Sequence, residues 1–298
     1  MKEKEIKKTN IDYFGGSILV IFSMLLGLNQ VLIKIVNYGI QPVFQAGLRS
    51  LLAIIPVIII AKLLDRDLEI DRESILPGIV CGIFFGVEFI FLFLSLDYTS
   101  VAHSSILFYS MPVWLCIASH YLIPDEKITI IKVIGLFLSV SGIILAFSMS
   151  GYEQNTSLFG DVLALLASIL WAGIVILVKT SPLKKSSPEI QLLYQLVVSS
   201  IILLPISIFF GDFVRNVSFE IVLIFLFQVI VIISIGFLVW FWILSIYPAA
   251  KMASFSFLAP IFGVMFGWLL LNEEINIYIF SSLFLVCSGI VLINKSKN

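Results

Sequence analysis

Glu88 is the residue of this sequence whose type and position could most readily do chemistry. It lies near the middle of a long apolar run at 75–96. If that run crosses a membrane, a charge there costs at least about 2.5–3.5 kcal/mol, so the residue is expected to have a use or a partner. A carboxyl group held there could take up and release a proton, or bind an amine. A structural ion pair, or a protonated acid hydrogen-bonded to a neighbouring helix, is the alternative that the sequence leaves open.

Other polar and aromatic residues are expected near Glu88. Arg49 lies about two turns in from the outer end of the apolar run 43–64. Asn29 and Gln30 lie at a comparable depth in the run 14–36. These side chains could line a cavity that opens outward, with Glu88 paired to Arg49 or to the amine of a bound molecule. The further candidates for the cavity wall are Tyr109, Trp171, Gln195 and Ser256.

The remaining aromatic and charged residues of the runs have ordinary membrane interpretations. Trp240 and Trp242 lie near the inner end of their run, where tryptophan usually belongs to the interfacial belt. His103 and Lys251 are expected to snorkel toward the interface or to cap a helix rather than to contact a ligand. Both aromatic candidates for the cavity, Tyr109 and Trp171, could instead face lipid.

Composition indicates the medium in which these residues lie. Hydrophobic residues make up 60% of the 298 residues and charged residues only 12%, with a mean hydropathy of +1.12. Backbone groups in lipid must pair within their own segment, so the runs are expected to be transmembrane helices. A net charge of -1 gives no reason to expect nucleic acid as a partner. Cys81, Cys116 and Cys287 fall inside apolar runs without disulfide or metal spacing.

The elements that must position the candidates are ten helices of an all-α integral membrane protein. Each is about 20 residues long, enough to cross a core of about 30 Å. The predicted spans are 14–36, 43–64, 75–96, 101–121, 129–149, 159–179, 189–210, 219–243, 249–271 and 276–293. Because all connections are short, we expect one membrane body of two halves, joined near 150–157.

The distribution of lysine and arginine predicts the orientation. With the N-terminus in the cytoplasm, the inner segments collect nearly all basic residues, and the outer ones hold Arg215, with Lys34 at a span edge. The positive-inside rule then places both termini in the cytoplasm. The lysine-rich start resembles a signal peptide, but the run after it is full-length and lacks a small-residue cleavage site. The expected location is the plasma membrane, in bacteria the inner membrane. The oligomeric state stays open, with a homodimer among the arrangements considered.

An internal repeat organises the chain. The passage Val101–Phe147, an apolar run containing a proline, an acidic turn and a second apolar run, recurs at Ala249–Asn294. Five helices per half is an odd number, so the second half is expected to be inverted relative to the first, as in many secondary transporters. Pro112 and Pro260 hold equivalent places, and we expect them to bend their helices and act in gating. Tolerated kinks are the alternative.

Small residues at every fourth position predict close helix packing in three of the spans. These residues are Gly78, Gly82 and Gly86, then Gly160, Ala164, Ser168 and Ala172, then Ala259, Gly263 and Gly267. The pattern places these helices in the core of the bundle.

One set of motifs runs through both halves. It comprises Asp97-Tyr98-Thr99-Ser100-Val101-Ala102, Pro112, Asp125-Glu126 and Ser141-Gly142, and then Tyr247-Pro248-Ala249-Ala250, Pro260-Ile261-Phe262, Trp268 and Glu273-Glu274, with Arg49 and Trp171-Ala172 also in place. This doubled set resembles the EamA family of drug/metabolite transporters over two five-helix repeats, 14–147 and 159–293. The resemblance implies inverted halves and export or exchange of small metabolites by alternating access. The sequence departs from the family at Gly27-Leu28-Asn29, where a tryptophan often precedes the glycine, and at His103, where small residues are usual.

Other function classes are less well supported. The sequence has no nucleotide-binding G-x-x-x-x-G-K-[ST] loop, no H-E-x-x-H helix and only two histidines, so no enzyme, metal site or cofactor is expected. A sensor, scaffold or channel would not need duplicated kinked helices around a mid-membrane charge. We expect a secondary transporter that exports a small organic metabolite, an amino acid or an amphipathic compound. A nucleotide-sugar or sugar-phosphate antiporter is the alternative. Proton coupling, exchange and facilitated diffusion all stay open.

Overall fold

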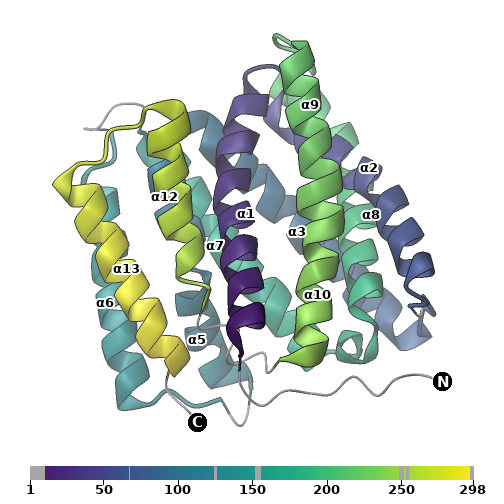
Figure 1. Ribbon diagram of the computed structural model, residues 1–298, viewed down its shortest axis with the longest axis horizontal. Coiled ribbons are helices and arrows are strands. Elements are labelled where there is room, and N and C mark those ends of the chain that lie inside the picture. The colour runs from purple at the N-terminus through teal and green to yellow at the C-terminus, as the bar shows by residue number, and fades with distance from the viewer. Residues whose placement is uncertain are drawn as a thin grey trace.

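The computed structural model describes residues 11–66, 68–123, 126–151, 156–247, 252 and 255–295. Every regular element of these residues is a helix (Figure 1). The bridge between Ile40 and Val214 is the only β pairing within them. The all-helical prediction is therefore confirmed. Its physical reason is that a backbone in lipid can satisfy all of its polar groups inside one helix.

The first half of the chain forms six helices. They are α1 Tyr13–Asn37, α2 Pro42–Leu63, α3 Arg72–Tyr98, α4 Val101–Phe108, α5 Met111–Leu122 and α6 Ile130–Ser148. Polar side chains begin several of them. Asp12, Asp71, Ser100 and Thr129 each accept a hydrogen bond from a backbone N–H of the following first turn. These caps satisfy donors that the start of a helix leaves free.

The second half contains longer and shorter helical segments. They are α7 Leu158–Thr180, η1 Pro182–Lys185, α8 Pro188–Ile206, η2 Ser207–Phe210, α9 Phe219–Phe227, the π-helix η3 Gln228–Gly236, α10 Phe237–Ile246, α12 Leu258–Leu271 and α13 Ile277–Lys295. The segments α9, η3 and α10 follow one another without a gap and correspond to the single predicted span 219–243.

In the described part of the chain, nine helical segments are long and apolar enough to cross a membrane. The ten predicted spans match these nine and the shorter apolar helix α12, which has 14 residues. The predicted span 249–271 is longer than α12 because its first residues fall mostly outside the described part. The structure thus supports a multi-pass membrane protein with nine or ten crossings.

Both prolines of the repeat lie in the first turn after an interruption of their predicted span, so the helix is broken there rather than bent as one continuous helix. The predicted span 101–121 divides into α4 and α5 at Tyr109–Ser110, and Pro112 is the second residue of α5. Pro260 is the third residue of α12. Proline is tolerated in a first turn, because the amide that it lacks would have no partner within the helix there.

Small residues let the helices pack closely, as their spacing predicted. A Cβ on Gly82 would lie 2.6 Å from the carbonyl oxygen of Tyr194 on α8, and one on Gly263 would lie 2.7 Å from the Cβ of Ser105 on α4. The helices α6 and α13 pair in the same way, since a Cβ on Gly135 would come within 2.7 Å of the Gly289 carbonyl oxygen.

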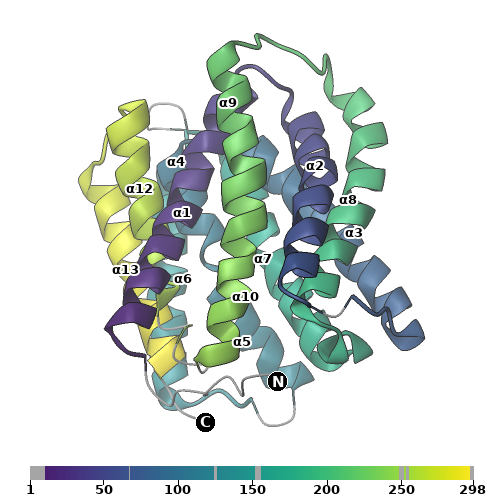
Figure 2. The same cartoon turned by 45° about the vertical axis from the view of Figure 1, so that its right-hand side comes forward.

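The helices form one bundle with two distinct ends. Figures 1 and 2 show α6 beside α13 at one side and α2 beside α8 at the other. The start of α1 and the end of α13 lie at the same end, which we call the terminal end. We call the opposite end, where α1 ends at Asn37 and α4 begins at Val101, the far end.

Candidate functional site

A cavity of about 400 Å³ lies inside the bundle, between helices of both halves. Seven of the eight predicted cavity residues line it: Asn29, Gln30, Arg49, Glu88, Tyr109, Trp171 and Gln195. Their side chains come from α1, α2, α3, α7 and α8 and from the break between α4 and α5. The position of each residue along its apolar run therefore predicted that these side chains would lie close together.

Arg49 and Glu88 carry the charge of the cavity. Both are almost fully buried, with exposed fractions of 1% and 3%. The Arg49 guanidinium lies over the rings of Phe89 and Phe93, 4.7 and 4.5 Å from their centroids, and its Nη1 donates to Asn29 Oδ1 at 3.4 Å. Within the described residues, Arg49 Nε and Glu88 Oε2 have no hydrogen-bond partner. The cavity thus presents a free donor on a cation and a free acceptor on an acid.

Aromatic side chains form one wall of the cavity. The rings of Phe108 and Trp171 stack at 5.0 Å and 14°, and Tyr109 meets Trp171 edge-on at 6.2 Å. The Tyr109 hydroxyl donates to the Leu26 carbonyl at 2.8 Å. The helix break after Phe108 places this tyrosine at the cavity. Such a wall offers an apolar surface with fixed geometry.

Ser256 is the predicted cavity residue that lies elsewhere. Its hydroxyl accepts a hydrogen bond from Asn294 Nδ2 at 3.1 Å, near the end of α13. The prediction treated 249–271 as one helix, which would place Ser256 at mid-depth, but α12 begins only at Leu258. Pro112 and Pro260 do not line the cavity either.

Several lining residues were missed from the sequence. Trp240, interpreted as a belt residue, lines the cavity, as do Lys179, Phe85 and Phe89. A usable signal existed for the phenylalanines, because Phe85 lies three residues before Glu88 on the same helix face and Phe89 lies one turn after Phe85. No such signal distinguished Trp240 from an interfacial tryptophan.

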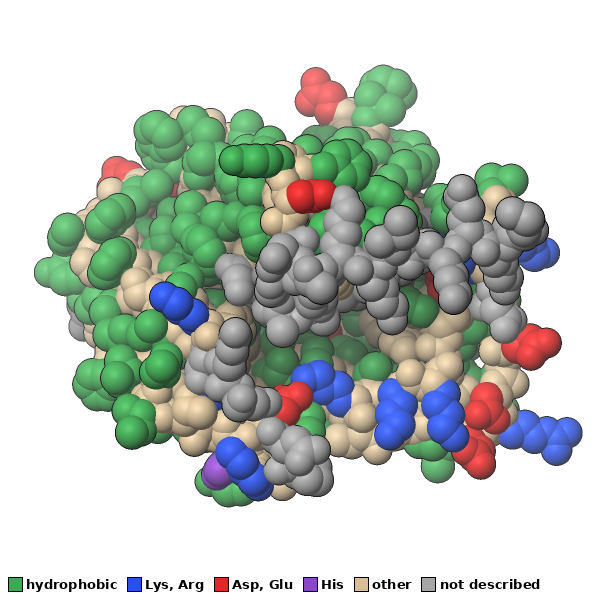
Figure 3. Space-filling view, turned by 60° about the horizontal axis from the view of Figure 1, so that its bottom comes forward, with side chains coloured by type: hydrophobic (Ala, Val, Ile, Leu, Met, Phe, Trp, Pro, Cys, Tyr) green, Lys and Arg blue, Asp and Glu red, His purple; other side chains and the backbone are tan. Residues whose placement is uncertain are grey.

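The cavity extends toward the terminal end. Its lining reaches Lys179 in the last turn of α7 and Gln191 in the first turns of α8. Figure 3 views the molecule from this end, where acidic and basic side chains gather. The expected opening, toward the opposite end, was therefore wrong. The reason is that the lining on α7 and α8 continues from Trp171 and Gln195 to Lys179 and Gln191 at the terminal end.

Lys179 is held at the rim by Glu126. Its Nζ lies 2.9 Å from Glu126 Oε1. Burial raises the pKa of Glu126, but the hydrogen bond from Lys179 and the positive charges of Lys179 and Lys132 outweigh it, so the pKa is lowered overall. Lys179 therefore forms a salt bridge with the neighbouring loop. Among the described lining residues, Arg49 is the cation without a salt bridge.

Polar contacts join the two halves at the far end. Arg215 forms a two-fold ion pair with Asp97 at 2.8 and 2.9 Å. Glu273 accepts hydrogen bonds from the backbone N–H groups of Val101 and Ala102 at 2.7 and 3.0 Å. Within the first half, Lys34 donates to carbonyls at the end of α3. The far end is closed by these contacts in this structure.

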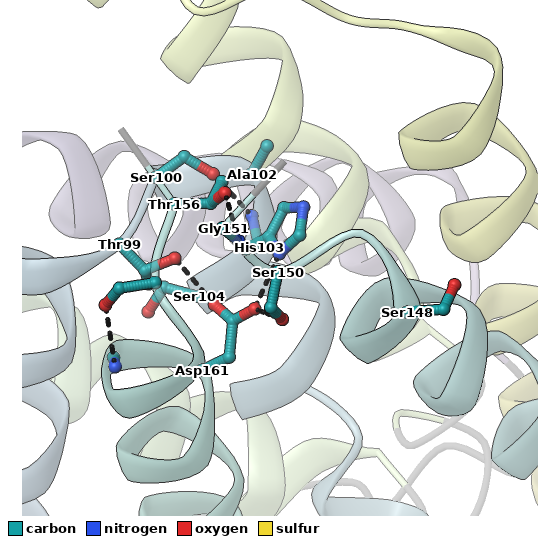
Figure 4. Close-up of polar contacts among 12 residues, drawn as sticks. Thr99, Ser100, Ala102, His103, Ser104, Ser148, Ser150, Gly151, Thr156 and Asp161 are labelled. Carbon is teal, nitrogen blue, oxygen red and sulfur yellow. Dashed lines mark hydrogen bonds and ion pairs between the residues drawn. The ribbon is translucent and has the colours of Figure 1, made fainter. Parts of the chain in front are cut away.

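The fully buried Asp161 completes the closure (Figure 4). Its carboxylate accepts from Thr99 Oγ1 at 2.6 Å, from His103 Nδ1 at 2.8 Å and from Ser150 Oγ. We call these four residues the Asp161 cluster. The interpretation of His103 as a snorkelling side chain was wrong, since only 1% of this residue is exposed and it pairs with an acid. Lys251 lies outside the described residues.

Comparisons with known proteins give a family match, two relatives and one solved structure. The EamA-like transporter family model matches residues 14–148 and 158–295. The uncharacterized transporter YoaV of Bacillus subtilis is 26% identical over 92% of this chain and 94% of its own length. A probable amino-acid metabolite efflux pump of Escherichia coli is 23% identical over 93% of each chain. A crystal structure of another protein shares the fold, with a TM-score of 0.67 at 14% identity over 92% of this chain and 94% of that one.

Proposed function

Because the chain belongs to the EamA-like transporter family, we propose that it is a secondary transporter that exports a small organic metabolite across the plasma membrane by alternating access. The chain is a multi-pass membrane protein. The family and the relatives reported above are named as transporters rather than as enzymes.

The pair of unsatisfied charged groups in the cavity carries this proposal. Arg49 Nε and Glu88 Oε2 are buried without partners, and leaving such groups unpaired costs about 1–3 kcal/mol each. A bound molecule that brings a carboxylate to Arg49 and an amine to Glu88 would satisfy both. That combination describes an amino acid, and the name of the Escherichia coli relative refers to amino-acid metabolites.

The remaining surface of the cavity favours an apolar group on the same molecule. Phe85, Phe108 and Trp171 line it together with aliphatic side chains. A cavity of about 400 Å³ lies within the usual range for small-molecule sites. We therefore favour an amphipathic amino acid. The phosphate-bearing alternative would need more cations than Arg49, because Lys179 is already paired.

Alternating access requires a bundle whose two ends open in turn, and the arrangement of helices is consistent with that. We propose ten crossings in two inverted five-helix repeats, 14–147 and 159–293, with both termini in the cytoplasm. The packing of α2 on α8, α6 on α13 and α4 on α12 fits a two-fold relation between the halves. In that orientation the cavity faces the cytoplasm, ready to load an exported compound. The starts of α5 and α12, at Pro112 and Pro260, are the proposed gating points.

A matched set of ligands tests the recognition of both charges. We expect phenylalanine to raise the melting temperature of the purified, detergent-solubilised chain. Phenethylamine lacks the carboxylate and phenylpropionate lacks the amine, so each should stabilise it less. Equal stabilisation by all three compounds would contradict the proposal, since the apolar group alone would then account for binding.

A further inference from the structure

We infer that His103 and Asp161 form a proton-binding site that holds the far end closed, and that proton uptake there opposes opening of that end. This inference deepens the proposed function and rests on it for the sidedness of opening. The cluster lies outside the cavity, because none of its four residues lines it.

The first step is that hydrogen-bond donors surround the carboxyl group of Asp161. Its two oxygens accept hydrogen bonds from Thr99, His103 and Ser150, and an ionised carboxyl group accepts only. It also lies in the first turn of α7, after the Ser157 cap, where the helix dipole favours a negative charge.

The second step is that His103 can take a positive charge beside it. Its Nδ1 lies 2.8 Å from Asp161 Oδ2, so the nitrogen that faces the acid carries the proton. His103 is in the first turn of α4, where a cation is normally disfavoured. Glu273 offsets that effect, since its carboxylate accepts the two N–H groups that begin α4. The protonated imidazole would therefore pair with Asp161, while Glu273 caps the start of the helix that carries it.

The other charged groups around the cluster are already engaged. Lys34 of α1 donates to the carbonyls of Leu96 and Thr99. Asp97 at the end of α3 pairs with Arg215, which also donates to the Asn37 carbonyl. Histidine alone among these side chain types ordinarily titrates between about pH 5 and 8. Proton uptake in this range therefore falls on His103.

The third step is that the cluster joins the two halves. Asp161 belongs to α7 of the second half, whereas Thr99, His103 and Ser150 precede it in the chain and lie at or beyond the ends of α3, α4 and α6. Separation of α4 from α7 at the far end would break the contact between His103 and Asp161. An ionised pair is stronger than a neutral one, so a bound proton favours the closed form. By linkage, the open form must bind that proton more weakly.

Export provides a use for this linkage. After a compound leaves through the far end, a proton taken up from the outer side would favour closure and return of the cavity to the cytoplasm. Proton uptake and outward opening would then exclude one another.

Sided labelling of a reporter cysteine tests the inference. Leu26 lines the cavity, and it is the Leu26 backbone carbonyl that accepts the hydrogen bond from Tyr109, so Leu26→Cys is introduced in a background without the native cysteines. An impermeant maleimide added outside intact cells reaches this cysteine only through the far end. After correction for the intrinsic pH dependence of a maleimide reaction with a free thiol, we expect the labelling rate to fall about tenfold between about pH 8 and about pH 5.5.

Two variants and a control make the result specific. His103→Asn keeps a donor at the position of Nδ1 but cannot take a charge, so labelling should lose its pH dependence. Asp161→Asn should give fast labelling at both pH values. Asp97→Asn removes another acid of the far end and should keep the pH dependence. Unchanged pH dependence in His103→Asn, or slow labelling of Asp161→Asn at both pH values, overturns the inference.

This readout does not depend on the transported compound. If the ligand set described above fails but the labelling behaves as expected, the proposed substrate class is wrong and the proton site stands. Labelling in inside-out vesicles, through the terminal end, should not become faster with these variants, because the two ends are proposed to open in turn, and a parallel rise there would also overturn the inference.

Discussion

Replacement of Glu88 by glutamine separates a transport role of this acid from a structural one. The substitution keeps the size of the side chain and removes its charge. If Glu88 serves mainly to neutralise the buried Arg49, the variant leaves an uncompensated cation in the protein interior. Removing one partner of a buried ion pair usually destabilises a protein by about 3–5 kcal/mol.

The structure indicates a smaller effect. Among the described ion pairs none joins Arg49 to Glu88, and the guanidinium lies on the rings of Phe89 and Phe93. Each such contact stabilises a desolvated cation by about 0.5–2 kcal/mol. We therefore expect Glu88→Gln to lower the free energy of unfolding by about 1 kcal/mol. Loss of a charged hydrogen bond to a substrate amine should reduce transport about 10- to 100-fold.

The assay combines thermal unfolding in detergent with uptake of labelled phenylalanine into proteoliposomes. Glu189→Gln is the matched control, because Glu189 is also buried but pairs with Arg66 at 3.6 Å, away from the cavity. It should retain transport. A large loss of stability in Glu88→Gln, with transport restored by adding Arg49→Gln, would refute the reasoning.

Three further predictions concern other parts of the chain. A single cysteine at Val217 should react with impermeant maleimide from outside cells, whereas one at Ser186 should be protected, and labelling of Ser186→Cys from outside would contradict the inverted orientation. Trp171→Ala removes a stacked ring of the cavity wall and should raise KM for phenylalanine more than for alanine, with equal effects on both counting against an aromatic binding wall. The pKa of Glu126 is lowered in the fold, although burial alone would raise it, because Lys179 donates a hydrogen bond to it and places a positive charge beside it. Its stabilising effect is thus complete above the ordinary glutamate pKa and is lost as the pH falls through the lowered value. Glu126→Gln should accordingly flatten the acid side of a plot of melting temperature against pH, and an unchanged slope would contradict this assignment.

The sequence predicted the helices and most of the cavity because both depend on depth along apolar runs. Arg49, Glu88 and Trp171 lie well inside separate runs, and the packing of α3 against α2 and α7 brings these positions together. Trp240 was misassigned because sequence position alone does not distinguish a ring that faces a cavity from one at the interface. The π-helix that precedes α10 changes the register of that segment, so the faces of its residues do not follow from a regular helical period.

The direction of the cavity and the role of His103 could not be read from the chain. Which end is closed depends on contacts between residues far apart in sequence, such as Asp97 with Arg215 and Val101 with Glu273. His103 and Asp161 are 58 positions apart, and neither lies in a motif that signals the other. Ser256 was misplaced because no capping side chain marks the start of α12 after Phe257. The sequence therefore did not show where that helix begins.

Counterflow in proteoliposomes tests most directly the claim that this chain carries an amino acid through the cavity of Arg49 and Glu88. Vesicles containing the purified chain are loaded with unlabelled phenylalanine and diluted into a trace of labelled phenylalanine. We predict transient accumulation of label above equilibrium, absent from empty vesicles and strongly reduced in vesicles with Glu88→Gln. Accumulation that is equal for wild type and Glu88→Gln, or no accumulation with any amino acid by a folded wild-type chain, would contradict the account.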